Sequence, residues 1–233
     1  MKKTPFTSAV IVAAGNATRM GLNTPKQLLV VGGRTVIEHT LSVFESCPLI
    51  DEIIVVTREQ DIEEIRRVCA SFTKLTAIVP GGKERCDSVM NGIAAADERA
   101  QFYAIHDGAR MLITQAEVTG VLQTAYKHNA ATLGTPVTDT IKAVDGMTIV
   151  STPDRASLYA VQTPQVFEKT LYLRALQNAK KMQLKVTDDC SLVEALGEKV
   201  TIAPGKYTNI KLTTATDLLV AQAILHDREK EQP

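Results

Sequence analysis

The segment SAVIVAAGNATRMGLNTPKQL, residues 8–28, decides the fold that we expect for this chain. It opens with a short apolar run, Ala9–Ala14, which is long enough for a buried strand and far too short to span a membrane. A loop of small and polar residues follows, with two glycines and two cations: Gly15, Gly21, Arg19 and Lys26. Backbone N–H groups in such a loop can approach phosphate oxygens closely, and the cations offset the phosphate charge. The segment therefore indicates a polyphosphate site after the first strand.

Two common phosphate-binding motifs do not match this loop. A Walker loop needs Gly-Lys-Ser or Gly-Lys-Thr at a fixed spacing, and none follows here. The dinucleotide fingerprint needs a third glycine between the outer two, and the residues between Gly15 and Gly21 include none. The loop thus argues against a P-loop NTPase and against a nicotinamide oxidoreductase.

Composition limits the remaining classes. The 233 residues are 45% hydrophobic, which is enough for one sizeable core, so we expect a single domain over 1–233. Lys plus Arg and Asp plus Glu both total 26, so there is no general basic field that would favour nucleic acid. Four widely spaced cysteines without a C-x-x-C pair favour a reducing cytoplasm over disulfides or a zinc site. The first apolar run is too brief for a signal peptide, and we expect no membrane association.

Further apolar runs alternate with helical patterns along the chain. Asp51–Thr57, Leu75–Val79 and Phe102–Ile105 are predicted as buried strands, and apolar residues at helical spacing separate them. Such alternation is typical of βαβ units. We therefore predict an α/β fold: a Rossmann-like three-layer α/β/α arrangement with a mostly parallel sheet. Ligands of such folds bind at the carboxyl ends of the strands.

Two later loops fall at predicted carboxyl ends. Residues 80–89, PGGKERCDSV, join a strand to a helix, and His106-Asp107-Gly108-Ala109-Arg110 follows another strand. A carboxylate at the position of Asp107 can hold a ribose hydroxyl or a magnesium-bound phosphate. From the residues alone, an ordinary Asp-Gly turn is an equal alternative.

An inserted β-hairpin is predicted near residues 137–155. Asp145-Gly146 between β-rich flanks is a strong hairpin signal. A lone hairpin has no core of its own and could reach a partner chain. The alternative is a solvated excursion in a monomer.

Taken in order, these motifs resemble a known family. Thr18-Arg19-Met20-Gly21 and Pro25-Lys26-Gln27 come first, the two loops follow, and Gln162-Thr163-Pro164-Gln165 comes last. From about Ser8 to Leu225 the chain resembles the 2-C-methyl-D-erythritol 4-phosphate cytidylyltransferase family, which are nucleotidyltransferases of the sugar- and polyol-activating type. The chain departs from the usual family residues at three positions: Ala17 replaces Gly, Gly108 replaces Ala, and Met111 replaces Pro.

The resemblance implies an activity, a cofactor and partners. The enzyme would convert CTP and 2-C-methyl-D-erythritol 4-phosphate to 4-diphosphocytidyl-2-C-methyl-D-erythritol and pyrophosphate, in non-mevalonate isoprenoid synthesis. Mg²⁺ or another divalent cation would be the cofactor. The hairpin would be a dimerisation arm of a cytoplasmic homodimer, in which each chain lends residues to its neighbour's site.

The resemblance also implies residue roles. The catalytic cations would be Arg19, Lys26, Arg155 and Lys211. The nucleotide would be bound by Ala13, Ala14, Gly15, Gly82, Ser88 and Asp107, with Asp107 also the metal ligand. The polyol phosphate would be bound by Gly108, Arg110, Thr140, Arg155, Thr163, Thr187 and Lys211. From the sequence itself, Thr187 is expected to cap a helix.

Two alternatives remain open at this point. A ribitol-5-phosphate cytidylyltransferase shares fold and chemistry, but that group tends to have Ala-Gly-Gly where this chain has Ala13-Ala14-Gly15. The run that starts at Thr187, TDDCSLVEAL, also looks more like the erythritol enzyme. A nucleotide-binding regulator without catalysis is the alternative of another class.

Overall fold

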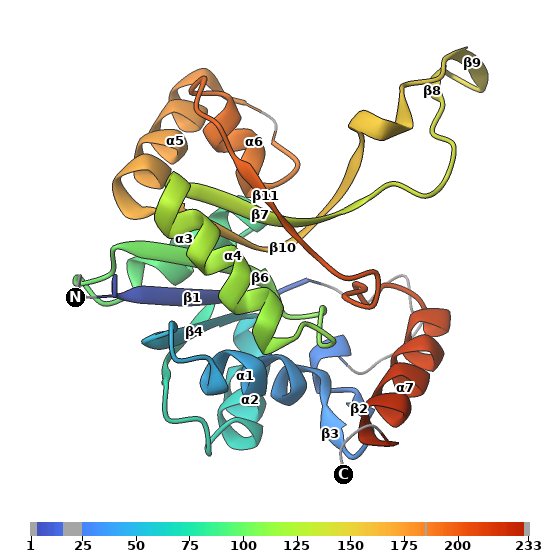
Figure 1. Ribbon diagram of the computed structural model, residues 1–233. Coiled ribbons are helices and arrows are strands. Elements are labelled where there is room, and N and C mark those ends of the chain that lie inside the picture. Colours follow the sequence, from blue (N-terminus) through green and yellow to red (C-terminus); the bar gives the residue numbers. More distant parts are fainter. Residues whose placement is uncertain (1–3, 16–24, 185, 231–233) are drawn as a thin grey trace.

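The computed structural model describes residues 4–15, 25–184 and 186–230 (Figure 1). Seven of its strands form one sheet in the order β11-β7-β10-β6-β1-β4-β5. Only β10 in that sheet is antiparallel to its neighbours, so the predicted mostly parallel sheet is confirmed. The seven strands are β1 (Thr7–Val12), β4 (Glu52–Thr57), β5 (Leu75–Pro80), β6 (Phe102–Asp107), β7 (Ala130–Pro136), β10 (Tyr159–Glu168) and β11 (Thr201–Pro204).

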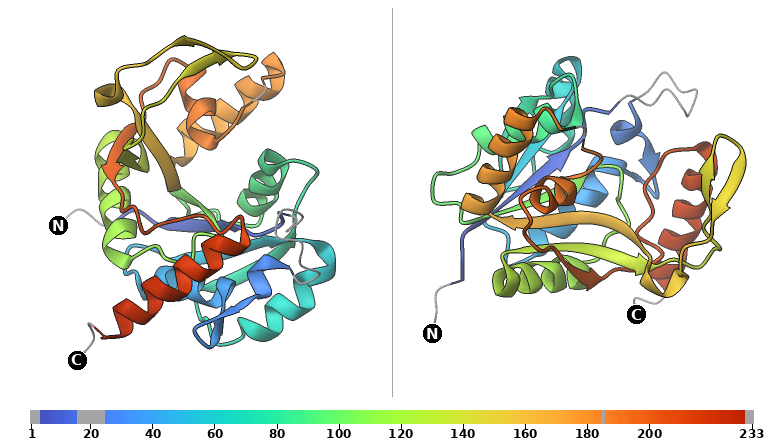
Figure 2. Two further views of the ribbon diagram at one scale, coloured as in Figure 1. Left: turned by 90° about the vertical axis from the view of Figure 1, so that its right-hand side faces the viewer. Right: turned by 90° about the horizontal axis from the view of Figure 1, so that it is seen from above.

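Helices cover both faces of the sheet, as Figure 2 shows from two sides. The helices in chain order are α1 (Val36–Ser46), α2 (Ile62–Val68), α3 (Arg85–Ala94), α4 (Gln115–His128), α5 (Lys169–Met182), α6 (Asp189–Glu194) and α7 (Ala215–Lys230). The described residues also form short 3-10 turns: η2 (Lys26–Leu28), η3 (Glu59–Asp61) and η4 (Arg155–Ser157).

Alternation along the central strands explains the layers. In β1, Ala9 and Ile11 pack into the apolar cluster shared with α1, α2 and α4, whereas Val10 packs into the cluster shared with α3, α5 and α6. All three side chains are fully buried. Successive residues of a strand point to opposite faces of the sheet. Because both faces of β1 are apolar, both must be buried, and a helical layer on each side buries them. The continuous apolar run at the start of the sequence is thus the signature of a central strand.

A third apolar cluster lies beside the sheet and under α7. It joins α7, through Ala221, to the short hairpin β2 (Val30–Val31) and β3 (Arg34–Thr35), and to the loop after β6. Met111, where the family usually has proline, is 2% exposed in this cluster. At this position the buried methionine contributes packing, whereas a proline would restrict the backbone of the loop through its ring.

The antiparallel strand β10 was not anticipated from the sequence. It pairs with both β6 and β7, and its register with β7 shifts between Val161 and Gln165. This irregular stretch contains Gln162, Thr163 and Pro164, beside the carboxyl end of β6. The strand therefore returns the chain from the hairpin and places Thr163 next to Asp107.

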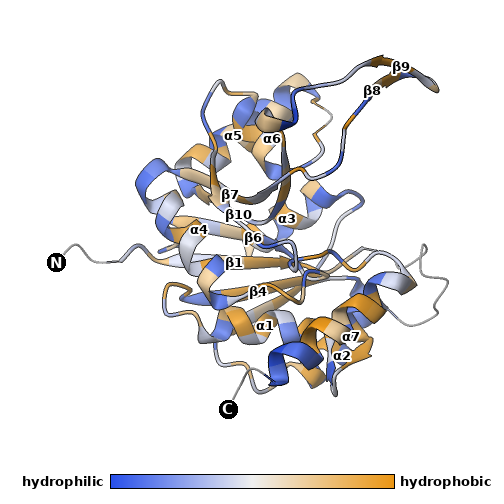
Figure 3. Cartoon of the chain, turned by 45° about the vertical axis from the view of Figure 1, so that its right-hand side comes forward, coloured by the Kyte–Doolittle hydropathy of each residue, from blue (hydrophilic) through white to orange (hydrophobic). Residues whose placement is uncertain are grey.

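The predicted hairpin is confirmed and projects from the sheet (Figure 1). Strands β8 (Ala143–Asp145) and β9 (Thr148–Ser151) pair only with each other in the described chain, and Gly146 adopts a left-handed φ of 56° in the turn. Both strands are exposed along their whole length, although they are rich in apolar residues (Figure 3). Val150 of β9 is 67% exposed, and Met147 in the turn is 98% exposed. We call residues 137–158 the arm.

Among the described residues, none of the helices has the length and apolar character needed to cross a bilayer.

Candidate active site

The candidate site lies at the point where the order of the sheet reverses. The chain leaves β1 toward β4 and β5 on one side, then crosses to β6 on the other side of β1. This divergence opens a crevice at the carboxyl ends of β1 and β6, where ligands of doubly wound sheets bind. A cavity of about 320 Å³ occupies this place. Its lining includes these residues with predicted roles: Ala14, Gly15, Lys26, Gly82, Ser88, Asp107 and Lys211.

One wall of the cavity is the loop between β5 and α3. A Cβ on Gly82 would lie 2.1 Å from the Cβ of Asp87, so this position requires glycine. The Gly82 N–H donates to Ser88 Oγ at 3.1 Å, and the Ser88 hydroxyl donates to the Glu84 carbonyl at 3.2 Å. The loop is therefore folded tightly over the start of α3, with backbone atoms facing the cavity. Gly82 and Ser88 therefore line the cavity at fixed positions, and such a rigid wall is suited to a planar base.

Asp107 lies at the centre of a group of cations. Its Oδ2 is 2.8 Å from Lys211 Nζ and 3.7 Å from Arg110 Nε, and its Oδ1 is 3.6 Å from Arg85 Nε. Burial by itself would raise the pKa of Asp107, but Lys211, Arg85 and Arg110 outweigh it and lower the pKa to about 2. The carboxylate is therefore ionised at neutral pH despite being 8% exposed.

Thr163 and His106 fix the backbone at Asp107. The Asp107 N–H donates to Thr163 Oγ1 at 3.0 Å, and Thr163 Oγ1 lies 3.1 Å from His106 Nδ1. His106 Nε2 is 3.3 Å from the Arg110 carbonyl, so Nε2 carries the proton and Nδ1 accepts from the hydroxyl. Burial lowers the pKa of His106 to about 3, and the ring is neutral. The predicted substrate-binding hydroxyl of Thr163 is thus engaged inside the protein.

Arg110 lies in the wall formed with the segment before α7. Its Nη1 donates to the Asn209 carbonyl at 2.8 Å, while its buried Nε has no hydrogen-bond partner among the described residues. Burial lowers the pKa of Arg110, and Asp107 only partly compensates. The Leu212 N–H donates to the Ala109 carbonyl at 2.9 Å, which ties the same segment to the loop after β6. Arg110 therefore retains a buried donor beside Asp107 that an anionic ligand could use.

The first loop contributes Lys26 to the cavity. Lys26 begins η2, is 9% exposed, and its Nζ donates to the Leu212 carbonyl at 3.4 Å. Ala13 is 2% exposed and lies just behind Ala14, and the Gly108 N–H donates to the Val12 carbonyl at 2.8 Å. The predicted cation Arg19 lies outside the described residues.

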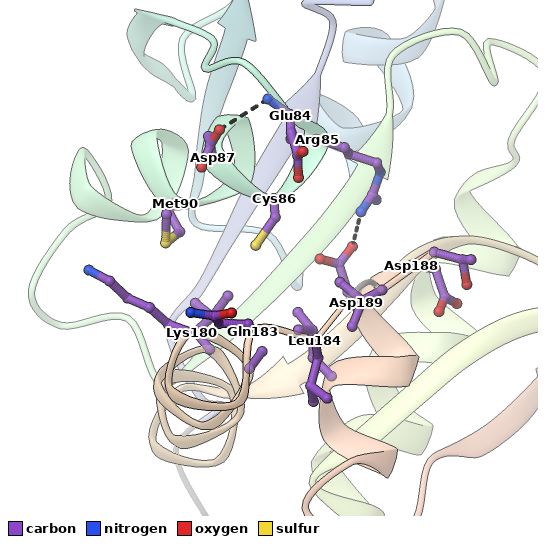
Figure 4. Close-up of a pocket in the computed structure, with 15 residues that line it drawn as sticks. Glu84, Arg85, Cys86, Asp87, Met90, Lys180, Gln183, Leu184, Asp188 and Asp189 are labelled. Atoms are coloured by element: carbon purple, nitrogen blue, oxygen red, sulfur yellow. Dashed lines mark hydrogen bonds and ion pairs between the residues drawn. The ribbon is translucent and has the colours of Figure 1, made fainter.

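Three predicted residues lie away from this cavity. Thr140 and Arg155 are exposed on the arm, where Arg155 Nη1 donates to the Thr138 carbonyl at 2.8 Å. Thr187 lines a second cavity of about 720 Å³ between α3, α5 and α6 (Figure 4). The expectation that Thr187 caps α6 is wrong: Asp188 is the N-cap, and its side chain accepts from the Ser191 N–H at 3.1 Å. The carboxylate one residue later is the stronger acceptor for a helix N-terminus.

Arg85 lines both cavities, although its sequence pattern did not indicate a site residue. Burial would lower the pKa of its guanidinium, but Asp189 and Asp107 together raise it, so the cation is firmly charged. The available signal was a cation in the first helical turn after the Gly81-Gly82 pair. That pattern alone does not distinguish a site residue from a surface arginine.

The donor chemistry at Asp107 fits a hard divalent cation. No cluster of three or more metal-ligating side chains occurs in the described parts of the chain. Mg²⁺ commonly binds through one or two carboxylates and completes its shell with substrate phosphates and water. Asp107 supplies one ionised carboxylate, and its Oδ1 is beyond hydrogen-bond distance of Arg85 Nε. A magnesium ion that arrives with a polyphosphate therefore fits this residue.

Comparison with known proteins agrees with this geometry. The family model described as 2-C-methyl-D-erythritol 4-phosphate cytidylyltransferase matches residues 7–227. The protein of that name from Halalkalibacterium halodurans is 43% identical over 96% of this chain and 98% of its own length. The one from Caldanaerobacter subterraneus is 45% identical over 94% of this chain and 98% of its own.

Solved structures give the same result. A 4-diphosphocytidyl-2C-methyl-D-erythritol synthase from Anaerococcus prevotii superposes with a TM-score of 0.87 at 33% identity, covering 96% of this chain and 100% of that one. The 2-C-methyl-D-erythritol 4-phosphate cytidylyltransferase from Thermus thermophilus gives 0.77 at 32% identity, covering 95% and 99%. With the sheet order and the cavity at its switch point, these matches establish that the chain belongs to the 2-C-methyl-D-erythritol 4-phosphate cytidylyltransferase family.

Proposed function

We infer that this chain is a cytidylyltransferase that joins CTP and 2-C-methyl-D-erythritol 4-phosphate, with release of pyrophosphate, in isoprenoid precursor synthesis. Family membership over nearly the whole chain supports the reaction. The observation from the structure that carries the inference is the ionised, buried Asp107 among Lys211, Arg85 and Arg110 at the end of β6. A carboxylate and several cations in one crevice suit a substrate that combines ribose hydroxyls with a polyphosphate.

The reaction needs no protein nucleophile. An ionised phosphate oxygen of the polyol substrate attacks the α-phosphorus of CTP, a new P–O bond forms, and the bond to the pyrophosphate oxygen breaks. Catalysis then depends on alignment of the two substrates and on stabilisation of charge at the α-phosphate. We propose that Lys26 and Lys211, with Arg19 from the first loop, stabilise that charge. The neutral state of His106 agrees with this proposal, because a buried neutral ring held at both nitrogens has no free base to offer.

We assign the nucleotide to the 320 Å³ cavity. Ala13, Ala14 and Gly15 would approach the triphosphate and ribose, Gly82 and Ser88 the cytosine, and Asp107 a ribose hydroxyl or the metal. Bound Mg²⁺ would neutralise part of the negative charge of the triphosphate. Asp107 would hold it through the carboxylate, and Lys211 keeps that carboxylate ionised.

We assign the polyol phosphate to the neighbouring side of Asp107. Gly108, Arg110 and Lys211 are adjacent to it there, and the Nε of Arg110, which has no hydrogen bond within the described residues, would gain a phosphate oxygen. Thr187 would contact the polyol from the second cavity. Because the Thr163 hydroxyl is already engaged, we propose that Thr163 contributes by holding Asp107.

We propose that the active form is a homodimer. The arm buries little in its own chain, yet it exposes Val144, Met147, Ile149 and Val150. Such a surface needs a partner. Thr140 and Arg155 on the arm would then enter the partner's site, which explains why they lie away from the cavity of their own chain. We further propose one nucleotidyltransferase domain over 1–233, operating in the cytoplasm.

The test is pyrophosphate release from CTP and Mg²⁺ with two acceptors in parallel, 2-C-methyl-D-erythritol 4-phosphate and ribitol 5-phosphate. Release with the erythritol phosphate alone is expected. Release with ribitol phosphate alone would keep the mechanism and change the substrate. Tight CTP binding without release in either reaction would indicate a regulator.

A further inference from the structure

Arg85 lies between two carboxylates that face different cavities. Its Nη1 donates to Asp189 Oδ2 at 2.6 Å, and its Nε is 3.6 Å from Asp107 Oδ1. Figure 4 shows Arg85, from the first turn of α3, pointing toward Asp189 at the start of α6. Asp189 lines the 720 Å³ cavity and does not line the 320 Å³ cavity. The arginine is thus a link between the nucleotide cavity and a residue outside it.

Asp189 is itself held from several sides. Its side chain is 2% exposed, and the Tyr172 hydroxyl donates to its Oδ1 at 2.5 Å. The Asp189 N–H donates to Gln165 Oε1 at 2.9 Å, and Gln165 Nε2 donates to Asp188 Oδ2 at 2.8 Å. Gln165 belongs to β10, two residues after Thr163, which accepts from the Asp107 N–H. Tyr172 of α5 thus holds the Asp189 carboxylate, while Gln165 of β10 holds its backbone.

The contact with Asp189 determines the position of the Arg85 guanidinium relative to Asp107. An arginine side chain is long and flexible, and a carboxylate and a guanidinium in contact prefer a bidentate pair. Asp189 takes the strong contact with Arg85, so Nε stays 3.6 Å from Asp107 and does not form a hydrogen bond with Oδ1. Asp107 lines the nucleotide cavity, and its Oδ1 is not hydrogen-bonded by this guanidinium there.

We propose that Asp189 is a positioning residue for the cytidylyl transfer: it holds Arg85 near Asp107 without letting it capture the carboxylate that faces CTP. The proposal rests on the function inferred above. If Asp189 is neutralised, Arg85 turns to Asp107 as its strongest remaining anion and competes with CTP and its metal for Oδ1. Loss of such an indirect contact typically lowers affinity or activity by about 10–100-fold.

The main variant is Asp189→Asn, which keeps the volume and removes the charge. The matched control is Asp61→Asn, since Asp61 is 8% exposed, bonds Arg58 at 2.6 and 3.0 Å, and lines neither cavity. Both variants lose the pair between a buried carboxylate and a partly exposed arginine, so both should melt at lower temperature. Only Asp189→Asn should weaken CTP·Mg²⁺ binding in calorimetric titration and lower kcat/KM, by about tenfold or more in each.

A double-mutant cycle separates positioning from simple packing. If Asp189 acts through Arg85, the variant Arg85→Ala/Asp189→Asn has the same kcat/KM and CTP affinity as Arg85→Ala alone. The proposal would be overturned if the double variant lost kcat/KM by the product of the two single losses. It would also be overturned if Asp189→Asn matched Asp61→Asn in CTP affinity and kcat/KM. A wild-type chain that binds CTP but releases no pyrophosphate would refute the proposed function, while the titrations would still decide the role of Asp189. A chain that binds no CTP would refute both.

Discussion

The backbone N–H of Asp107 donates to the hydroxyl of Thr163 at 3.0 Å, which joins the end of β6 to the irregular middle of β10. The same hydroxyl donates to the neutral His106 ring, 3.1 Å away. One side-chain oxygen therefore satisfies two buried groups on consecutive residues. The position of the central carboxylate depends on this oxygen as much as on the cations around it.

Replacement of Thr163 by valine should harm both stability and activity. Thr163→Val keeps the shape and leaves the Asp107 N–H and His106 Nδ1 without partners, which costs roughly 1–3 kcal/mol per buried group. Urea unfolding measures the stability loss, and pyrophosphate release measures the activity. Thr7→Val is the control, because Thr7 is also fully buried and its hydroxyl meets Tyr126 Oη at the far end of β1. Equal losses of kcat/KM in the two variants would contradict a role for Thr163 in holding Asp107.

Lys26→Met should lower turnover far more than stability. Methionine keeps an apolar stem in this buried position and removes the charge, so we expect kcat to fall by ~10²–10³, as for loss of one electrostatic donor. The melting temperature reports on the fold. Lys74→Met serves as the control, since Lys74 Nζ also donates to a backbone carbonyl, that of Cys47 at 2.7 Å, outside the site. A folded Lys26→Met chain with full activity would remove Lys26 from the catalytic cations.

The low pKa of Asp107 predicts a pH-dependent stability. The folded-state pKa of about 2 lies below the unfolded value of about 3.9, so the ionised carboxyl stabilises the fold. This contribution is complete well above pH 4 and is lost as the pH falls toward 2. The stability difference between the wild type and Asp107→Asn should therefore shrink by about 1 kcal/mol between pH 6 and pH 3. Urea unfolding at the two pH values measures it, and a constant difference would mean that Lys211 does not stabilise the charge.

The proposed sharing of sites between subunits can be tested by complementation. Lys26→Met and Arg155→Ala chains should each be nearly inactive alone. If Arg155 enters the partner's site, a mixed dimer contains one site with both native residues, so an equimolar mixture should recover about a quarter of wild-type activity. The mixture is made by joint refolding and assayed for pyrophosphate release. No recovery in a confirmed mixed dimer would mean that Arg155 serves the site of its own chain, together with Lys26 of that chain.

A second variant tests the arm itself. Ile149→Asp/Val150→Asp should give a monomer by light scattering, because both side chains are more than half exposed in the single chain. The melting of the monomer should stay close to that of the wild-type subunit, since the arm strands pair only with each other in the described chain. A dimer that persists would place the interface elsewhere.

The sequence predicted those parts of the fold that local pattern determines. Strand β1 and its neighbours are uninterrupted apolar runs, and Asp145-Gly146 specifies its hairpin within a few residues. Strand β10 escaped prediction because Gln162-Thr163-Pro164-Gln165 interrupts its apolar pattern and its pairing depends on distant strands. Periodicity and turn chemistry contain no information on such partners.

The site shows the same division. The glycine loop and Asp107 could be derived from residue types at strand ends, while Lys211, Arg155 and Thr187 came only from the family resemblance. Arg85 was not predicted because its role depends on the hydrogen bond with Asp189, which lies 104 positions further along the chain. The hydrogen bonds of the Thr163 hydroxyl were not predicted for a similar reason. Nothing in the sequence links His106 to Thr163, which lies 57 positions further along.

The segment that ties Leu212 to Ala109, and brings Lys211 to Asp107, follows β11, the last described strand of the sheet, in the chain. Folding of a nascent polypeptide begins from its amino-terminal part. The sheet can therefore assemble while the crevice still lacks its closing wall. A chain that stopped before residue 211 would retain the strands of the sheet and yet lack the lysine that contacts Asp107, so the crevice is completed only after the sheet that supports it.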